Sequence, residues 1–133
     1  MASRNQADAF NTFGLEQPQP TFAHLKPERE RLPVTRYLRQ FEDMLLKQDV
    51  IIVSSGTGSG KTTQIPQYIA YLGRKLKLRG RIACTQPRRL TATQVARRVA
   101  EEAGCQLGAQ VGYQIRGEDR TSEETQLMYV HFC

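Results

Sequence analysis

The stretch that decides the fold is SSGTGSGKTT, residues 54–63, which directly follows the apolar run VIIV at residues 50–53. It holds three glycines, six Ser or Thr residues and one lysine. This composition suits neither a helix interior nor a strand, because glycine loses much backbone freedom on ordering and hydroxyl side chains compete for backbone hydrogen bonds. The segment is therefore predicted to be a loop with a specific backbone shape.

A glycine-rich loop between a strand and a helix is typical of phosphate binding. Several backbone N–H groups can surround a phosphate only where some residues take conformations that glycine adopts cheaply. The helix expected after the loop adds the positive end of its dipole, Lys61 can reach the β- and γ-phosphates, and Thr62 can place its hydroxyl on Mg²⁺. The sequence therefore predicts a P-loop NTPase fold. The expected nucleotide contacts are Ser55, Gly56, Thr57, Gly58, Ser59, Gly60, Lys61, Thr62 and Thr63.

One position departs from the usual G-x-x-x-x-G-K-T pattern. Ser55 stands where the first glycine is expected, and it would strain the backbone if that position needs a positive φ. The alternative interpretation of the whole segment is a glycine-rich turn that binds nothing. The expected strand before it and the expected helix after it favour the P-loop.

Apolar periodicity outside the loop predicts an α/β fold. Strand, glycine loop, helix, strand and helix in this order predict part of a doubly wound parallel sheet, and 133 residues can be less than a whole domain of this kind. The expected helices are 33–48, a segment from about residue 60 into the basic stretch at 74–80, and 88–103; the expected strands are 50–53, 81–85 and 127–130.

The first 30 residues are polar and turn-prone and are predicted to be a flexible N-terminal leader, with residues 31–133 forming the partial domain. Apolar side chains in the leader are expected to be unstructured, to tuck loosely against the domain or to dock on a partner. They are Phe10, Phe13, Leu15 and Phe22.

Charge is distributed unevenly along the chain. Residues 50–100 carry ten Lys or Arg and no Asp or Glu, although the whole chain has a net charge of only +6. This asymmetry favours a polyanionic partner, the alternative being a solvated basic face. No apolar stretch approaches the roughly 18 residues of a membrane span, and the three cysteines are too widely spaced to predict a metal site or a disulfide framework. We expect a soluble, intracellular protein.

Four segments in order resemble the first RecA-like domain of DEAH-box RNA helicases, over about residues 30–130. They are LPVTRY at 32–37, GSGKTTQIPQ at 58–67, TQPRRLTATQVARRVAEE at 85–102 and VGYQIRGED at 111–119. The resemblance implies a partial RecA-like sheet that binds ATP and Mg²⁺ and meets single-stranded RNA. Splicing, ribosome assembly and RNA decay are all roles of the family, in the nucleus or the cytoplasm, and adaptor proteins are possible partners.

The resemblance also implies roles for individual arginines. Arg88 and Arg89 match a motif that grips the RNA backbone, with Thr85 beside them, and the loop that holds Arg116 would form a second RNA-facing turn. Arginines at a helix N-terminus oppose the dipole, so an anionic ligand explains them better than plain surface charge does. Arg98 matches an arginine that stacks on adenine, which a flat guanidinium can do; the alternative is an ordinary polar-face residue.

Several motifs that follow in the family do not occur in this sequence. They are the acidic DEAH motif, the Ser-Ala-Thr motif and a second RecA-like domain with arginine fingers. We therefore expect a domain that is incomplete at its C-terminus and that hydrolyses ATP at or near background by itself, since an arginine finger alone is worth about 10³ to 10⁵ in rate. Two interpretations stay open: the ATP-binding portion of a DEAH-box RNA helicase, or a non-catalytic product that binds nucleotide, RNA or helicase partners. Another P-loop enzyme, such as a small kinase, is disfavoured by the arginine motif.

Overall fold

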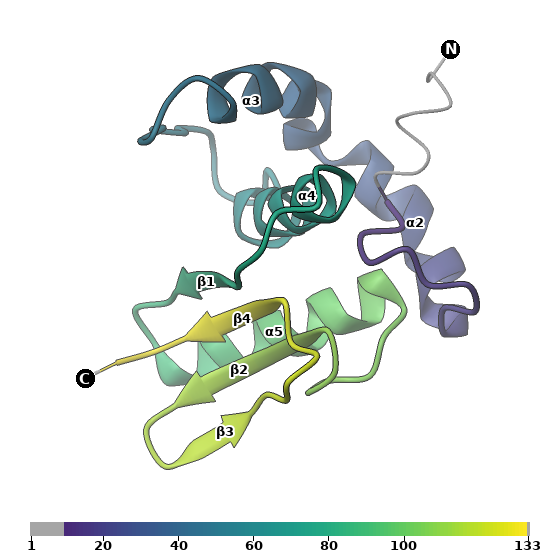
Figure 1. Cartoon of the computed structure of the whole chain (residues 1–133), viewed down its shortest axis with the longest axis vertical. Coiled ribbons are helices and arrows are strands. Elements are labelled where there is room, and N and C mark those ends of the chain that lie inside the picture. The colour runs from purple at the N-terminus through teal and green to yellow at the C-terminus, as the bar shows by residue number, and fades with distance from the viewer. Residues whose placement is uncertain (1–9, 133) are drawn as a thin grey trace.

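A four-stranded sheet with one helix packed on it forms the lower part of the molecule in Figure 1. The computed structural model describes residues 10–132 of the chain. The sheet has the strand order β1-β4-β2-β3, in which β1 and β2 pair with β4 in parallel and β3 pairs with β2 antiparallel. The strands are β1 (Ile82–Thr85), β2 (Val111–Ile115), β3 (Glu118–Arg120) and β4 (Leu127–Val130). The sheet is therefore mixed, whereas the sequence predicted a wholly parallel one.

Helix α5 (Arg89–Ala103) packs on this sheet through small side chains. Ala92, Ala96 and Val99 are all fully buried, and they repeat at the spacing that places residues on one helix face. Small residues let the helix approach β2 and β4 closely, where Val111 and Leu127 are also fully buried. The predicted helix at 88–103 and the predicted strands at 81–85 and 127–130 are confirmed.

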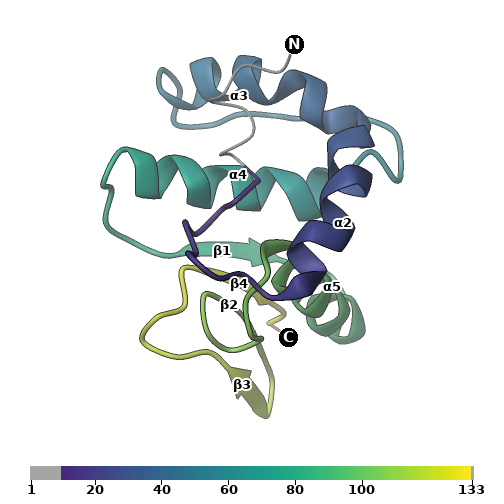
Figure 2. The same cartoon turned by 90° about the vertical axis from the view of Figure 1, so that its right-hand side faces the viewer.

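Helices α4 (Lys61–Lys75) and α3 (Leu38–Leu45) continue the molecule beyond β1, one above the other in Figure 2. They share a second, smaller apolar cluster, made of Leu38, Tyr68, Tyr71 and Leu72. The helix predicted from about residue 60 is confirmed. Among residues 10–132, no helix is both long enough and apolar enough to cross a bilayer.

The helix predicted at 33–48 differs in its first turn, which is the 3₁₀ helix η1 (Pro33–Tyr37). The backbone N–H of Thr35 bonds to the carbonyl of Leu32 at 3.1 Å, and the Thr35 hydroxyl donates to the same oxygen at 2.6 Å. These two bonds span three residues and tighten the turn, because a short hydroxyl side chain competes with the α-helical pattern.

The strand predicted at 50–53 does not form. Val50 is 80% exposed and Ile52 is 88% exposed, and none of the strands that the structure describes lies beside them. One edge of β1 also has no neighbouring strand, since β1 pairs with β4 alone among the described strands. A β-branched run is suited to a buried strand, but it becomes one only where a neighbouring strand takes up its backbone N–H and C=O groups.

The prediction of a flexible leader also needs correction within residues 10–30. Helix α2 runs from Pro20 to Arg31 and stands beside α4 and α5 in Figure 2, while Phe10 and Phe13 are buried. A backbone bond from Gln19 N to the carbonyl of Gly104 (2.8 Å) fixes the start of α2 to the end of α5. Residues 1–9 of the predicted leader lie outside the described residues.

Candidate functional site

The glycine loop has the backbone conformation that its composition predicted at two of its three glycines. Gly58 and Gly60 have φ angles of +79° and +95°, in the left-handed region that favours glycine. Gly60 is the last residue before α4, and a Cβ there would lie 3.0 Å from Leu32 Cδ1. Ser55 does not have a positive φ, so serine causes no backbone strain at this position.

Lys61 folds back over the loop at the first residue of α4. Its ammonium donates to the carbonyl of Ser55 at 2.5 Å, to the hydroxyl of Ser55 at 3.0 Å and to the carbonyl of Gly56 at 3.4 Å. The hydroxyls of Ser55 and Ser59 are 2.6 Å apart. The Ser55 hydroxyl therefore contacts both Lys61 and Ser59, and a glycine would lack these two contacts.

Two outside contacts hold the loop in place. The N–H of Val34 donates to the carbonyl of Ser59 at 3.1 Å, and Ser59 is buried. On the other side, the hydroxyl of Tyr129 in β4 donates to the carbonyl of Thr62 at 2.8 Å. The loop is thus anchored to η1 and to the sheet, while Gly56, Thr57 and Gly58 are exposed.

The N-terminus of α4 can attract an anion. No described side chain caps it, and its first turn contains no acidic residue. The first N–H groups of a helix have no partner within the helix and carry the positive end of its dipole. The Thr62 hydroxyl is exposed beside them, while the Thr63 hydroxyl donates to the carbonyl of Gly60 at 3.4 Å. N–H groups, an ammonium and an exposed hydroxyl make a donor set that fits a phosphate chain with Mg²⁺.

The arginines predicted to meet RNA lie on two neighbouring segments. Thr85 is the last residue of β1, Arg88 precedes the first residue of α5, and all three of Thr85, Arg88 and Arg89 are exposed. Arg116 lies in the turn between β2 and β3, and its carbonyl accepts a hydrogen bond from Arg89 Nη2 at 3.1 Å. The structure therefore brings together residues that are far apart in the sequence.

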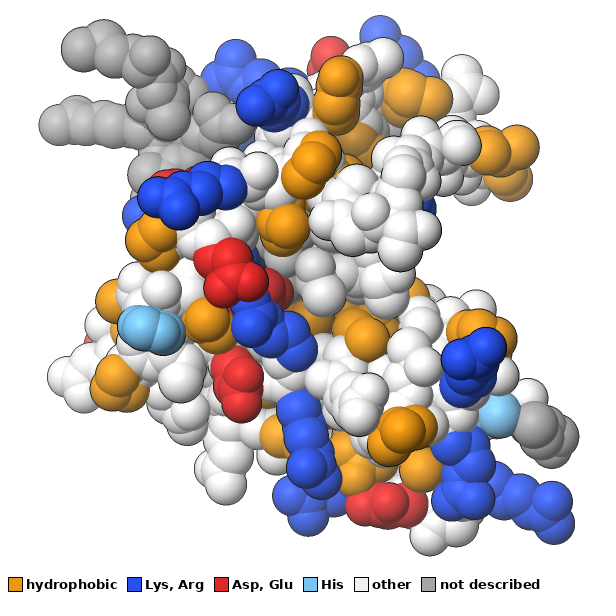
Figure 3. Space-filling view, turned by 180° about the vertical axis from the view of Figure 1, so that it is seen from behind, with side chains coloured by type: hydrophobic (Ala, Val, Ile, Leu, Met, Phe, Trp, Pro, Cys, Tyr) orange, Lys and Arg blue, Asp and Glu red, His pale blue; other side chains and the backbone are white. Residues whose placement is uncertain are grey.

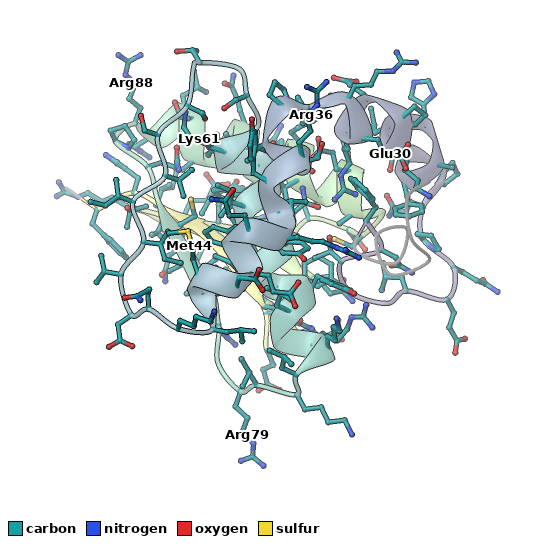
Figure 4. All side chains as sticks on the ribbon, turned by 90° about the horizontal axis from the view of Figure 1, so that it is seen from above. Glu30, Arg36, Met44, Lys61, Arg79 and Arg88 are labelled. Atoms are coloured by element: carbon teal, nitrogen blue, oxygen red, sulfur yellow. The ribbon has the colours of Figure 1, made fainter. Side chains whose placement is uncertain are left out.

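Figure 4 shows where Lys61 lies relative to Arg88 and Arg79. Lys61 and Arg88 lie toward the same end of the molecule, and Arg79 lies at the opposite end. Figure 3 shows Lys and Arg side chains at many places on the rear face, with Asp and Glu side chains among them, and a hollow at one side of this face.

Sequence reasoning missed a buried polar network behind the loop. Arg29 is 2% exposed and donates to Gln64 Oε1 (3.1 Å), to Gln67 Oε1 (2.9 Å) and to the carbonyls of Phe10 (2.9 Å) and Glu102 (3.0 Å). Burial lowers the pKa of Arg29, the Glu102 charge partly offsets this effect, and the resulting pKa is about 10. The guanidinium is therefore charged at neutral pH. The sequence gives one sign of this network: the polar residues Gln64 and Gln67, three residues apart, lie among the apolar residues of the helix predicted from about residue 60.

Arg98 lies at the edge of this network rather than free on the surface. It forms ion pairs with Glu102 (3.3 Å) and with Glu28 of α2 (2.9 Å). Burial by itself lowers the pKa of Arg98, but the two carboxylates outweigh this effect and raise it. Glu102 is 2% exposed and accepts further bonds from Gln64 and Gln67 of α4. Arg98 is thereby connected to the helix that carries Lys61.

The chain is similar to a known protein over most of its length. No family model matches the chain. Over 110 residues, which are 83% of its length, the chain is 49% identical to the pre-mRNA-splicing factor ATP-dependent RNA helicase prp22 of Schizosaccharomyces pombe. The chain spans 9% of the length of that relative, so the similarity concerns one short region of a much longer protein. The chain is therefore similar to one region of an ATP-dependent RNA helicase, in agreement with the resemblance of its motifs to DEAH-box RNA helicases.

Proposed function

We propose that the chain is an ATP-binding part of a DEAH-box RNA helicase, which holds ATP and Mg²⁺ at residues 55–63. The observation that carries this proposal is the geometry around Lys61. The ammonium lies over the loop carbonyls, next to an uncapped helix N-terminus with no acid in its first turn. A triphosphate would replace these carbonyls as the partner of the ammonium, and Thr62 would hold the Mg²⁺.

Single-stranded RNA is the polyanion that we propose for the arginine cluster. Arg89 contacts the backbone of Arg116, and Arg88 and Thr85 lie close to Arg89 in the sequence. Arg88 lies toward the same end of the molecule as Lys61 (Figure 4). Guanidinium groups and helix N-terminal N–H groups bind phosphate oxygens without reading the bases. The proposed contact is therefore with the RNA backbone and is independent of sequence.

The name of the relative supports a nuclear setting. It is a pre-mRNA-splicing factor, and splicing substrates are RNA. We accordingly propose an intracellular, nuclear role in RNA processing for the protein of which this chain is a part, with adaptor proteins as further partners.

Nucleotide binding is tested with a fluorescent ATP analogue and Mg²⁺ on the purified 133-residue chain. We expect saturable binding that Lys61→Met weakens by at least tenfold, because the variant removes the only charge in the loop. Lys47→Met, at an exposed lysine after α3, is the matched control and should bind like wild type. A folded wild-type sample with no affinity for the analogue would contradict the proposal.

RNA binding is tested by titrating a labelled single-stranded oligonucleotide at several salt concentrations. The double variant Arg88→Ala with Arg89→Ala should bind RNA more weakly. The slope of log affinity against log salt concentration should become shallower by about 0.7 for each phosphate that the variant no longer neutralises. The double variant Lys77→Ala with Arg79→Ala removes the same charge from the exposed loop after α4 and should leave the slope near the wild-type value. Equal effects of the two variants would show general attraction to a basic surface and would refute a defined RNA site.

A further inference from the structure

A continuous chain of side-chain hydrogen bonds connects the glycine loop to Arg98. Gln64 Nε2 donates to the Thr63 hydroxyl at 2.9 Å and to Glu102 Oε2 at 3.1 Å. The other oxygen of Glu102 accepts from Arg98 Nε at 3.3 Å. Arg98 Nη2 then donates to Glu28 Oε1 at 2.9 Å, which brings the network to helix α2. The orientation of Arg98 is therefore fixed from three helices.

The two carboxylates hold one edge of the Arg98 guanidinium. Nε and Nη2 lie on the same edge of this planar group, and their N–H bonds, which lie in its plane, donate to Glu102 and to Glu28. Partners at the N–H edge leave the two flat faces available, and the side chain is 38% exposed. A flat, weakly hydrated cation held in this way is suited to lie against a planar ring.

We propose that Glu28 and Glu102 are positioning residues that hold Arg98 in a fixed plane against the base of the bound nucleotide, an inference that rests on the nucleotide binding proposed above. Glu102 supplies the rigid anchor, because it is buried and accepts from Gln64 and Gln67 as well as from Arg98. Glu28 fixes the remaining rotation of the group. Helix α2 thereby contributes to base binding without touching the nucleotide.

An ordinary surface ion pair is the alternative to this role. Glu28 is 64% exposed, and exposed pairs contribute little to stability. The two roles differ in which ligand they affect. Loss of a positioning residue weakens the binding of a ligand that contains a base and does not change the binding of a ligand made only of phosphates. A structural residue that acts through the fold changes both.

The test uses Glu28→Gln, which keeps the size of the side chain and removes its charge. Dissociation constants are measured for ATP and for inorganic tripolyphosphate, both with Mg²⁺. We expect Glu28→Gln to weaken ATP binding by about two- to fivefold, the range that an exposed ion pair allows, and to leave tripolyphosphate binding unchanged. Glu30→Gln, two residues along α2 and paired only weakly with Lys26 (3.9 Å), is the control and should change neither.

A second variant shows whether Glu28 acts through Arg98. In an Arg98→Ala background, Glu28→Gln should have no further effect on ATP binding. Unchanged or tighter ATP binding by Glu28→Gln, an equal loss for both ligands, or an additive loss in the double variant would each overturn the positioning role. Failure of wild-type protein to bind ATP and tripolyphosphate alike would overturn the proposed function together with it.

Discussion

The hydroxyl of Tyr129 donates to the carbonyl oxygen of Thr62 at 2.8 Å, and this bond joins β4 to the first turn of the helix that carries Lys61. Tyr129 is fully buried, so the hydroxyl has no water to replace this partner. Tyr129→Phe should lower the free energy of unfolding by about 1 kcal/mol, the net contribution of a typical hydrogen bond. Urea denaturation of the two proteins measures this difference, and an unchanged midpoint would contradict the bond.

The pH dependence of this variant provides an internal check. Burial raises the pKa of Tyr129 above its ordinary value near 10. Above about pH 10 the unfolded chain loses this proton while the folded protein keeps it, so the wild-type protein loses stability there. Tyr129→Phe lacks the titrating group. The stability difference between the two proteins should therefore shrink as the pH rises above 10.

Arg29 is expected to be the most sensitive position in the N-terminal segment. Arg29→Met would leave Gln64, Gln67 and two carbonyls without their charged donor in a buried site, and should cost about 3 kcal/mol. Arg29→Lys should not restore the loss, since an ammonium cannot reproduce the geometry of a guanidinium. The measurement is again the free energy of unfolding in urea.

The matched control for Arg29 is two residues away, at the end of α2. Arg31 is exposed, and Arg31→Met removes the same charge. It should change stability by no more than about 0.5 kcal/mol. Similar losses for the two variants would mean that net charge, rather than the buried network, stabilises α2.

Two glycines of the loop should respond differently to alanine. Gly60 has φ +95°, and a Cβ would lie 3.0 Å from Leu32 Cδ1 and 3.2 Å from Val34 Cγ1. Gly60→Ala should therefore destabilise the protein by roughly 1–2 kcal/mol and weaken binding of the ATP analogue. At Gly56, a Cβ would meet no described heavy atom within 4 Å, so Gly56→Ala should change stability by less than about 0.5 kcal/mol. The reverse order would show that the loop has another conformation in solution.

The elements that the sequence predicted correctly are those whose apolar spacing is sustained. Helices α4 and α5 each run for 15 residues, and β1 and β4 are short apolar runs between turns. The left-handed backbone at Gly58 and Gly60 could also be predicted, because glycine adopts it most cheaply. The sequence predicted Arg88, Arg89 and Arg116 separately as candidate RNA contacts. The contact between Arg89 and the turn at Arg116 is visible only in the structure.

The elements that the sequence did not predict depend on distant partners. Helix α2 contains almost no apolar face, and its burial depends on Arg29 reaching side chains about 35 residues later, which periodicity cannot detect. The run at 50–53 was predicted to be a strand, but the structure has no strand there. Its composition favours a buried strand, but whether it pairs is decided by which strands lie beside it. Local sequence sets a preference in both cases, and tertiary contacts decide the outcome.

Substitution at Ile52 tests whether the run at 50–53 is exposed rather than paired in a sheet. Ile52 is 88% exposed, so Ile52→Lys should change the free energy of unfolding by no more than about 0.5 kcal/mol. The added charge should also reduce self-association, measured by light scattering, because an exposed apolar run and an open sheet edge at β1 both favour pairing between chains. Leu72→Ala, at a residue that is 1% exposed, is the contrasting variant and should cost about 2–5 kcal/mol. If Ile52→Lys were as damaging as Leu72→Ala, the run at 50–53 would be buried in solution, and the strand predicted from its sequence would be correct after all.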